Sequence, residues 1–377
     1  MGLQPGTFIG PNLRLRKLLA MGGMGSVWEA DHQRLETRVA VKLIADVLLS
    51  EPNARRRFAL EAEAAAQIRG PHVVQILDHG STDQGVPFIV MELLEGESLG
   101  ARLQRRGRIA LDETAVIVQQ TSKALGRAHE LGFVHRDIKP DNLFLTDHDG
   151  ELFVKVLDFG IAKRHGESMS MTRTGAALGT PRFMSPEQLA NAKQVTPAAD
   201  IWSLAAVAYR ALMGKAPFDG ESAAAVWAAI SRTSFPLPSR IRVDLPSSLD
   251  IWFRKALNVD RVNRFPSARE FAETFARAAQ LPPGLAVQAR LPARDKPSAN
   301  DAVPFDAPAL SLRSVATPTA LRRRECIHYV PPRKTDDLPP RPAQGFTHDD
   351  SGGADKQPSQ THGETWGYER EEEFRRR

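Results

Sequence analysis

Residue types suited to phosphoryl transfer cluster at positions 135–142, where the sequence reads HRDIKPDN. Asp137 can accept the proton of a hydroxyl group, and Lys139 can neutralise the charge that shifts during the transfer. Asn142 follows Asp137 by five residues and can hold Mg²⁺ through its side-chain oxygen. Because chance would have to place all of these residue types in this order, we interpret the segment as a catalytic loop.

Two segments nearer the start of the chain suit the binding of a nucleotide. Residues 19–27 read LAMGGMGSV, a glycine-rich turn whose backbone N–H groups can approach phosphate oxygens because side chains are missing. The alternation of residues 39–42, VAVK, points Lys42 into the cleft below this turn. Glu61 is spaced to form an ion pair with Lys42. Taken alone, the turn is more often a plain hairpin and Glu61 a solvated helix residue.

Together these segments resemble the catalytic elements of eukaryotic-like protein kinases, and Gly-Gly-Met-Gly at residues 22–25 resembles the bacterial serine/threonine branch. The resemblance covers about residues 8–278. It implies an α+β, two-lobed protein-kinase fold, with a small β-rich N-lobe at about 8–94 and a larger, mainly helical C-lobe at about 95–278. It also implies that the protein transfers the γ-phosphate of ATP, with Mg²⁺, to Ser/Thr hydroxyls of proteins.

The resemblance assigns the nucleotide and metal sites residue by residue. Phe144 would form the floor below the adenine ring, and Asp158, in the triplet DFG, would bind Mg²⁺ together with Asn142. The expected ATP-binding residues are Leu19, Ala20, Met21, Gly22, Gly23, Met24, Gly25, Ser26, Val27, Lys42, Glu92, Leu94 and Phe144. Ala20 stands where the family has its first loop glycine, so we expect a stiffer turn and slightly weaker nucleotide binding.

Residues 179–187, GTPRFMSPE, resemble the segment of protein kinases that receives a protein substrate. Thr180 would hydrogen-bond to Asp137 and Lys139, and this arrangement implies serine/threonine rather than tyrosine acceptors. Met91, at the end of a strand-like run, would occupy the gatekeeper position beside the adenine.

The resemblance also implies two contacts that hold the C-lobe together. Glu187 would form an ion pair with Arg264, and Asp200 would brace the backbone of the catalytic loop from the central helix of the lobe. Ser185 stands where the family usually has alanine. This departure is mild, because the position is not expected to take part in the chemistry.

A switch is expected in the segment between the DFG triplet and Thr180. Thr172 and Thr174 lie eight and six residues before Thr180, a spacing that resembles the paired threonines of bacterial relatives. Arg136 precedes Asp137 and would attract a phosphate placed on either threonine. We therefore expect autophosphorylation at these two positions to order the segment, with Ser168 and Ser170 as second choices. The alternative is that its Ser and Thr residues only keep it soluble.

Two other protein classes share this fold and are alternatives to a protein kinase. A pseudokinase would be expected to have lost at least one chemistry-bearing residue, yet Lys42, Asp137, Asn142 and Asp158 are all present. A small-molecule phosphotransferase would lack a segment like residues 179–187. Phosphate incorporation into a generic basic protein would separate a protein kinase from both alternatives.

Periodicity and composition agree with a globular kinase domain. Strand-like runs occupy Leu13–Leu19, Val39–Leu43, Val86–Glu92, Leu143–Leu145 and Phe153–Leu157. Helical patterns occupy Ala54–Ile68, Thr114–Leu131 and Ala198–Met213. The net charge of +5 comes from scattered residues, which argues against nucleic-acid binding. A single cysteine, Cys326, fits a cytoplasmic protein, and no apolar run is long enough for a membrane span.

The composition changes after about residue 279. Residues 279–377 contain proline pairs and runs of like charge, for example at Arg322–Arg324, and we expect this tail to be disordered. Its Pro-rich stretches at 331–333 and 339–342 could dock on a partner protein as polyproline II segments. The charge run at Arg322–Arg324 could bind an anion, but a short run of this kind is more often simply solvated.

The first prediction concerns this tail. Removal of residues 290–377 should leave a soluble domain that still phosphorylates a generic protein substrate, because every catalytic element precedes Arg264. The measurement compares the expression, monodispersity and phosphate transfer of the shortened and full-length chains. Insoluble or inactive shortened protein would mean that the tail docks on the kinase domain.

Overall fold

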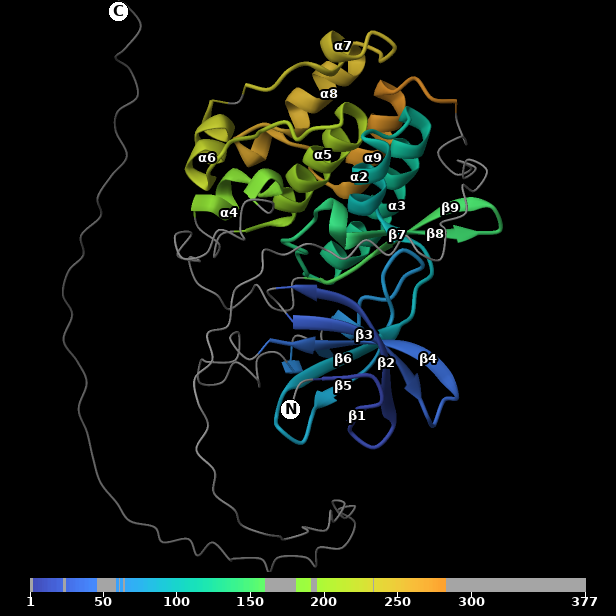
Figure 1. The fold of residues 1–377 in the computed structure, drawn as a ribbon. Coiled ribbons are helices and arrows are strands. Elements are labelled where there is room, and N and C mark those ends of the chain that lie inside the picture. Colours follow the sequence, from blue (N-terminus) through green and yellow to red (C-terminus); the bar gives the residue numbers. More distant parts are fainter. Residues whose placement is uncertain are drawn as a thin grey trace, which may run out of the picture. The chain divides into compact units, whose positions relative to one another are not determined.

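The computed structural model describes residues 3–22, 25–45, 59–60, 62–63, 65–159, 181–190, 195–232 and 234–282. The expected site residues outside these ranges are Gly23, Met24, Glu61, Thr172, Thr174 and Thr180. The expected tail lies outside them from residue 283 onward. Within the described ranges a β-rich part is followed along the chain by a mainly helical part (Figure 1), and no helix there is long and apolar enough to cross a membrane.

An antiparallel sheet forms the N-lobe. Its strands, in spatial order, are β1 (Phe8–Ile9), β2 (Leu13–Gly22), β3 (Gly25–His32), β4 (Thr37–Ile44), β6 (Pro87–Glu92) and β5 (Ile76–Ser81). Side chains alternate between the two faces of the sheet, so the row Trp28, Val41 and Val90 belongs to one buried apolar cluster. The neighbouring row contains Val27 and Lys42, which therefore share the other face.

The C-lobe is built around α5 (Pro197–Met213). Nearly every side chain of this helix is buried, and the helix belongs to the largest apolar cluster of the described residues. The surrounding helices are α2 (Leu99–Arg106), α3 (Leu111–Glu130), α4 (Pro186–Ala190), α6 (Ala223–Ser231), α7 (Pro238–Ile241), α8 (Ser248–Ala256) and α9 (Ala268–Ala278). A small sheet contains β7 (Glu97–Ser98), β8 (Leu143–His148) and β9 (Glu151–Val156).

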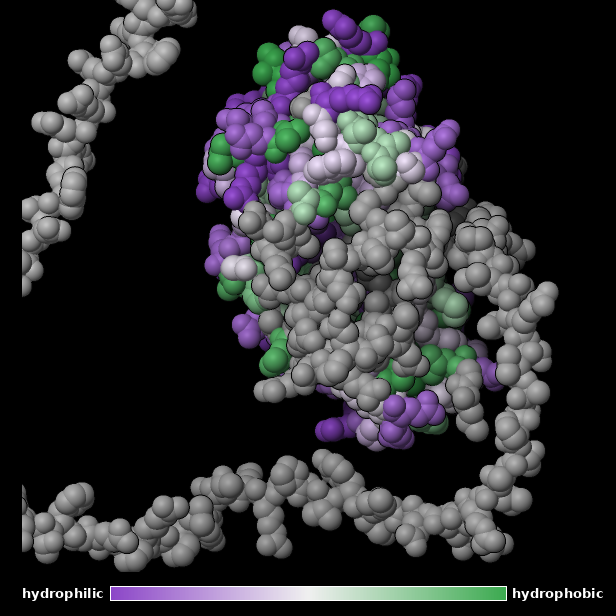
Figure 2. All heavy atoms as spheres, turned by 90° about the vertical axis from the view of Figure 1, so that its left-hand side faces the viewer, coloured by the Kyte–Doolittle hydropathy of each residue, from purple (hydrophilic) through white to green (hydrophobic). Residues whose placement is uncertain are grey.

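Aromatic side chains fill the interior of the C-lobe. Trp202 of α5 stacks on Phe218 with ring centroids 5.4 Å apart, and Trp252 of α8 contacts Phe271 and Phe275 of α9. By contrast, hydrophilic residues cover much of the upper part of the face in Figure 2, where apolar residues form small separate groups. Helix packing is therefore driven by an apolar core that is largely hidden from solvent.

The observed elements agree with the sequence expectations at most positions. Strands β2, β4, β6, β8 and β9 and helices α3 and α5 coincide with predicted runs, with ends that differ by a few residues. The helix expected at Ala54–Ile68 is helical at its described positions between 59 and 66. The two-lobed α+β fold is thus confirmed, whereas the exact domain boundaries stay a prediction.

Contacts across strand β9 join the two lobes. The N–H of Val74 donates to the carbonyl of Val156 at 3.0 Å, and the N–H of Val156 donates to the carbonyl of His72 at 2.9 Å. Beside them, Lys155 of β9 forms an ion pair with Glu92 at the end of β6, with 2.7 Å between Nζ and Oε1. These bonds hold the end of β6 close to the sheet of β7, β8 and β9, whose strand β8 directly follows the catalytic loop in the chain.

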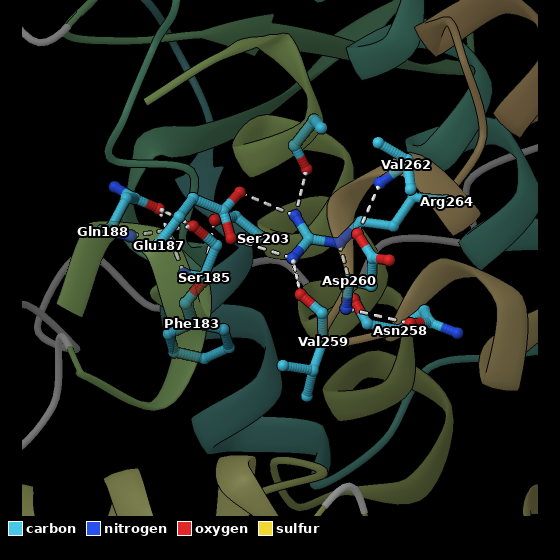
Figure 3. Close-up of polar contacts among 11 residues, drawn as sticks. Phe183, Ser185, Glu187, Gln188, Ser203, Asn258, Val259, Asp260, Val262 and Arg264 are labelled. Atoms are coloured by element: carbon cyan, nitrogen blue, oxygen red, sulfur yellow. Dashed lines mark hydrogen bonds and ion pairs between the residues drawn. The ribbon is translucent and has the colours of Figure 1, made fainter. Parts of the chain in front are cut away.

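Arg264 connects three parts of the C-lobe (Figure 3). Its guanidinium donates two hydrogen bonds to Glu187, at 2.7 and 2.8 Å, and further bonds to the carbonyls of Asn258, Val259 and Ala198. The predicted Glu187–Arg264 pair is therefore present. Burial alone raises the pKa of Glu187, but the hydrogen bonds and charge of Arg264 outweigh this effect and leave that pKa below its ordinary value.

The depressed pKa of Glu187 predicts a loss of stability in acid. The ion pair stabilises the fold above the ordinary glutamate pKa of 4.5, and this contribution is lost as the pH falls through the lower pKa of the folded state. Glu187→Gln should lower the free energy of unfolding by about 3 kcal/mol near neutral pH and flatten its acid dependence. Urea unfolding at several pH values measures both effects.

The matched control for this prediction is Glu130→Gln, because the side chain of Glu130 is 70 % exposed in its pair with Arg127. A surface pair contributes little to stability, so this variant should follow the wild-type pH dependence. If Glu187→Gln has the same acid dependence as both the wild type and the control, the pair does not determine stability in acid.

Candidate active site

The catalytic loop places three predicted side chains together. The carboxylate of Asp137 is largely buried, and its Oδ2 lies 3.2 Å from Lys139 Nζ. The amide of Asn142 donates to the same Oδ2 at 3.1 Å and to the backbone carbonyl of Asp137 at 2.8 Å. A 3₁₀ turn at Pro140–Asn142 brings Asn142 back to Asp137. These contacts fix the direction of the carboxylate.

Asp200 of α5 holds the backbone of this loop. Its two carboxylate oxygens accept the backbone N–H groups of His135 and Arg136, each at 2.8 Å, and Oδ2 also lies 2.8 Å from His129 Nε2. The Asp200 side chain is completely buried, so these partners replace the water that a charged group needs. The predicted bracing contact is present. It supports Arg136 in a left-handed conformation with φ of 65°, which is costly for a residue with a side chain.

The imidazole of His135 connects the catalytic loop with the strand end before Asp158. Its Nδ1 accepts the N–H of Asp137 at 3.2 Å, so the ring hydrogen belongs on Nε2, which faces the carbonyl of Leu157 at 2.8 Å. The N–H of Leu157 donates to the carbonyl of Asn142 at 2.9 Å. The segment that carries Asp158 is therefore anchored to the loop that carries Asp137.

The side chain of Lys42 forms an ion pair with Asp158 of the C-lobe. Its Nζ lies 2.7 Å from Oδ1 of Asp158, and the lysine side chain is only 13 % exposed. Glu61, the residue expected from the sequence to form an ion pair with Lys42, lies outside the described residues. Asp158 adopts a left-handed conformation with φ of 51°. The lysine expected at the phosphates and the carboxylate expected at the metal are thus side by side.

The glycine-rich turn lies between β2 and β3. Gly25 has a φ of 132°, and a Cβ atom placed there would lie 1.9 Å from the carbonyl oxygen of Leu43, so only glycine fits. A Cβ on Gly22 would meet no atom within 4 Å. Ala20 has no positive φ and pairs with Val27 across the two strands. The alanine is accommodated without backbone strain.

Sequence reasoning did not identify Lys155, which positions the expected adenine-binding segment. Glu92 accepts Lys155 Nζ and the backbone N–H of Gln75 on the same Oε1, each at 2.7 Å. Lys155 also faces Phe144 in the β8–β9 pairing. In the sequence, Lys155 stands out only as a single charged residue between two valines, Val154 and Val156, both of which are buried in the structure.

The other residues expected at the adenine differ in exposure. Leu94 and Phe144 are half-buried, while Leu19 and Met21 on β2 are exposed. Behind Lys42 and Asp158 lies a small, mainly apolar pocket. It is lined by Lys42, Ala65, Val73, Val74, Ile76, Ile89, Met91, Asp158 and Phe159. The expected gatekeeper Met91 therefore borders this pocket.

The oxygen donors of the site fit Mg²⁺ bound together with a nucleotide. No group of three or more His, Cys, Asp or Glu side chains suited to a metal occurs among the described residues. Mg²⁺ usually takes only one or two protein ligands beside substrate phosphates, so Asp158 and Asn142 are sufficient. Because Asn142 Nδ2 is bonded to Asp137, its Oδ1 is the atom that can face a cation.

Comparisons with known proteins agree with this geometry. Residues 13–274 match the family model described as protein kinase domain. The chain is 36% identical over 344 residues to serine/threonine-protein kinase PknA of Mycobacterium tuberculosis, which covers 89% of this chain and 77% of that protein. It is 37% identical over 267 residues to serine/threonine-protein kinase PknH of Mycobacterium bovis, covering 71% of this chain and 44% of that protein.

A solved structure also matches the fold. The crystal structure of the Mycobacterium tuberculosis PknI kinase domain superposes with a TM-score of 0.59 and 27% sequence identity, covering 74% of this chain and 100% of that one. The range 13–274 of the family match contains every described site residue. The chain belongs to the protein kinase family and is an ATP-dependent serine/threonine protein kinase.

Proposed function

We propose that Asp137 is the general base of this kinase and accepts the proton of a Ser or Thr hydroxyl of a protein substrate. The observation that supports this role is the fixing of its Oδ2 by Lys139 and Asn142. A carboxylate held in one direction can abstract a proton without first reorienting. Lys139 stabilises the ionised carboxylate and then the charge on the transferring phosphoryl group.

The nucleotide takes its place between the glycine-rich turn and β8. Backbone groups from Glu92 to Leu94 bind the adenine edge, while Leu19, Val27 and Phe144 enclose its faces. The contact between Lys155 and Glu92 supports this assignment, because it fixes the start of the segment that would bind adenine. The other residues of the glycine-rich turn, up to Ser26, bring their N–H groups to the phosphates.

Lys42, Asp158 and Asn142 hold the phosphates and their counter-ion. Mg²⁺, when bound, neutralises the charge of the β- and γ-phosphates. Asp158 and Asn142 are its ligands in this proposal, and Lys42 binds phosphate oxygens with Glu61 as its partner. The 2.7 Å contact between Lys42 and Asp158 supports the assignment, because it brings the cation for the phosphates next to the ligand for the metal.

The role of Asp137 predicts a selective loss of turnover. Asp137→Asn should lower the rate of phosphate transfer to a protein substrate by about 10²–10⁴-fold, because the amide cannot accept the proton. The affinity for ATP should change little, since the base acts in the transferring step and not in the ground-state complex. Radiolabelled phosphate transfer and calorimetric ATP binding measure the two quantities. Wild-type turnover in this variant would contradict the assignment.

We also propose that the kinase activates itself. Phosphate on Thr172 or Thr174 would pair with Arg136 and order the segment that shapes the substrate pocket, where Thr180 would contact Asp137 and Lys139. The observation that supports this is the position of Arg136, whose backbone is held directly beside the proposed base. Docking of partners on the Pro-rich tail and a cytoplasmic location stay predictions.

Autophosphorylation is testable by mass spectrometry. After incubation with Mg²⁺ and ATP, the protein should carry phosphate on Thr172 and Thr174, and the Thr172→Ala, Thr174→Ala double variant should have a lower kcat on a protein substrate. The matched control is the Ser168→Ala, Ser170→Ala double variant from the same segment, which should keep the wild-type kcat. Unmodified threonines, or equal kcat in both double variants, would exclude this switch.

A further inference from the structure

The peptide between Arg136 and Asp137 is held at both of its polar groups. Its carbonyl oxygen, on Arg136, accepts a hydrogen bond from Gln188 Nε2 of α4 at 2.8 Å. Its N–H group, on Asp137, donates to His135 Nδ1 at 3.2 Å. The other side of Arg136 is bonded to Asp200. A residue in a left-handed conformation persists only where its surroundings enforce it, and Gln188 is one of these restraints.

The orientation of the Gln188 amide follows from its neighbours (Figure 3). Its Oε1 accepts both the backbone N–H and the hydroxyl of Ser185, each at 3.1 Å. Because a backbone N–H can only donate, the amide oxygen must face Ser185. The Nε2 group must then face Arg136, where it meets a carbonyl that can only accept. Both ends of the amide are therefore matched in polarity to their partners.

Ser185 holds Gln188 in place. Its hydroxyl accepts the backbone N–H of Gln188 at 3.3 Å, while the glutamine side chain returns to the N–H of Ser185. This reciprocal pair is the capping box of a helix N-terminus, with Ser followed three residues later by Gln. Ser185 is completely buried. The serine that departs from the usual alanine thus has a structural role, because it fixes the side chain that reaches Arg136.

We propose that Gln188 is a positioning residue for phosphoryl transfer. Its amide fixes the plane of the peptide that precedes Asp137, and the plane sets the direction in which the Asp137 carboxylate points. The proposal rests on the proposed role of Asp137 as the base. Loss of the amide donor frees the carbonyl of Arg136 to turn, and misplacement of a reacting group by about 1 Å can cost about 100-fold in rate. ATP affinity should change little, since the proposed contacts to the adenine and Lys42 at the phosphates lie on other elements, and only Lys139 and Asn142 share the loop of Asp137.

The test compares Gln188→Met with a matched control, Gln120→Met. Gln188 is half-buried and Gln120 is buried, but both amides join two backbone groups, since Gln120 donates to the carbonyl of Leu152 and accepts the N–H of Val154. Both variants should lose thermal stability. Only Gln188→Met should lower kcat, by about tenfold or more, with the dissociation constant for ATP unchanged. Single-turnover phosphate transfer to a peptide substrate confirms that the chemical step is affected.

A second variant, Gln188→Glu, gives a readout that a purely structural role would not move. An ionised glutamate keeps an acceptor for Ser185 but places an oxygen against the carbonyl of Arg136. At low pH the protonated carboxyl can donate to that carbonyl again. The kcat of this variant, divided by that of the wild type, should therefore rise as the pH is lowered. This ratio also decides the question if Gln188→Met fails to fold.

Two results would overturn the proposal. One is a kcat of Gln188→Met that equals the wild-type value or falls no further than that of Gln120→Met. The other is a constant kcat ratio for Gln188→Glu at every pH. In either case, the general-base assignment would stand if the wild type transfers phosphate and Asp137→Asn does not. The two hypotheses can therefore fail separately.

Discussion

The buried carboxylate of Asp200 is the contact on which the geometry of the active site depends. A charged group without access to water is stable only when hydrogen-bond donors surround it, and here the donors are backbone groups of the catalytic loop and the ring of His129. The requirement works in both directions. If the loop moved away, the carboxylate of Asp200 would stay buried without hydrogen-bond donors. The position of the loop is therefore set by α5 and thus by the apolar core of the C-lobe.

From this anchor, short contacts lead to the nucleotide site. His135 binds Asp200 through its backbone and the carbonyl of Leu157 through its ring, which brings the following Asp158 to the loop. Asp158 in turn meets Lys42 on the sheet of the N-lobe. Each link is a hydrogen bond or ion pair of at most 2.8 Å. Groups from both lobes are therefore arranged relative to one buried residue.

Local motifs were predictable from the sequence, and contacts between distant segments were not. Asp137, Lys139 and Asn142 lie within one short run, so their types and spacing reveal their association. By contrast, Gln188 reaches Arg136 over 52 residues and Lys155 reaches Glu92 over 63. A single Gln or Lys is compatible with many environments, and only the folded chain selects the partner. The pair of Glu187 and Arg264, 77 residues apart, was expected only through the family resemblance.

The surroundings of Arg264 restrict which residue can occupy this position. Five hydrogen bonds leave its guanidinium, two to Glu187 and one each to the carbonyls of Asn258, Ala198 and Val259. Arginine has five N–H donors in a planar fork, whereas lysine has three on a single atom. Lysine would preserve the charge but leave at least two of these five acceptor contacts without a donor from this side chain. The site thus distinguishes two cationic side chains by the number and geometry of their donors, and charge conservation alone is no guide to tolerated substitutions there.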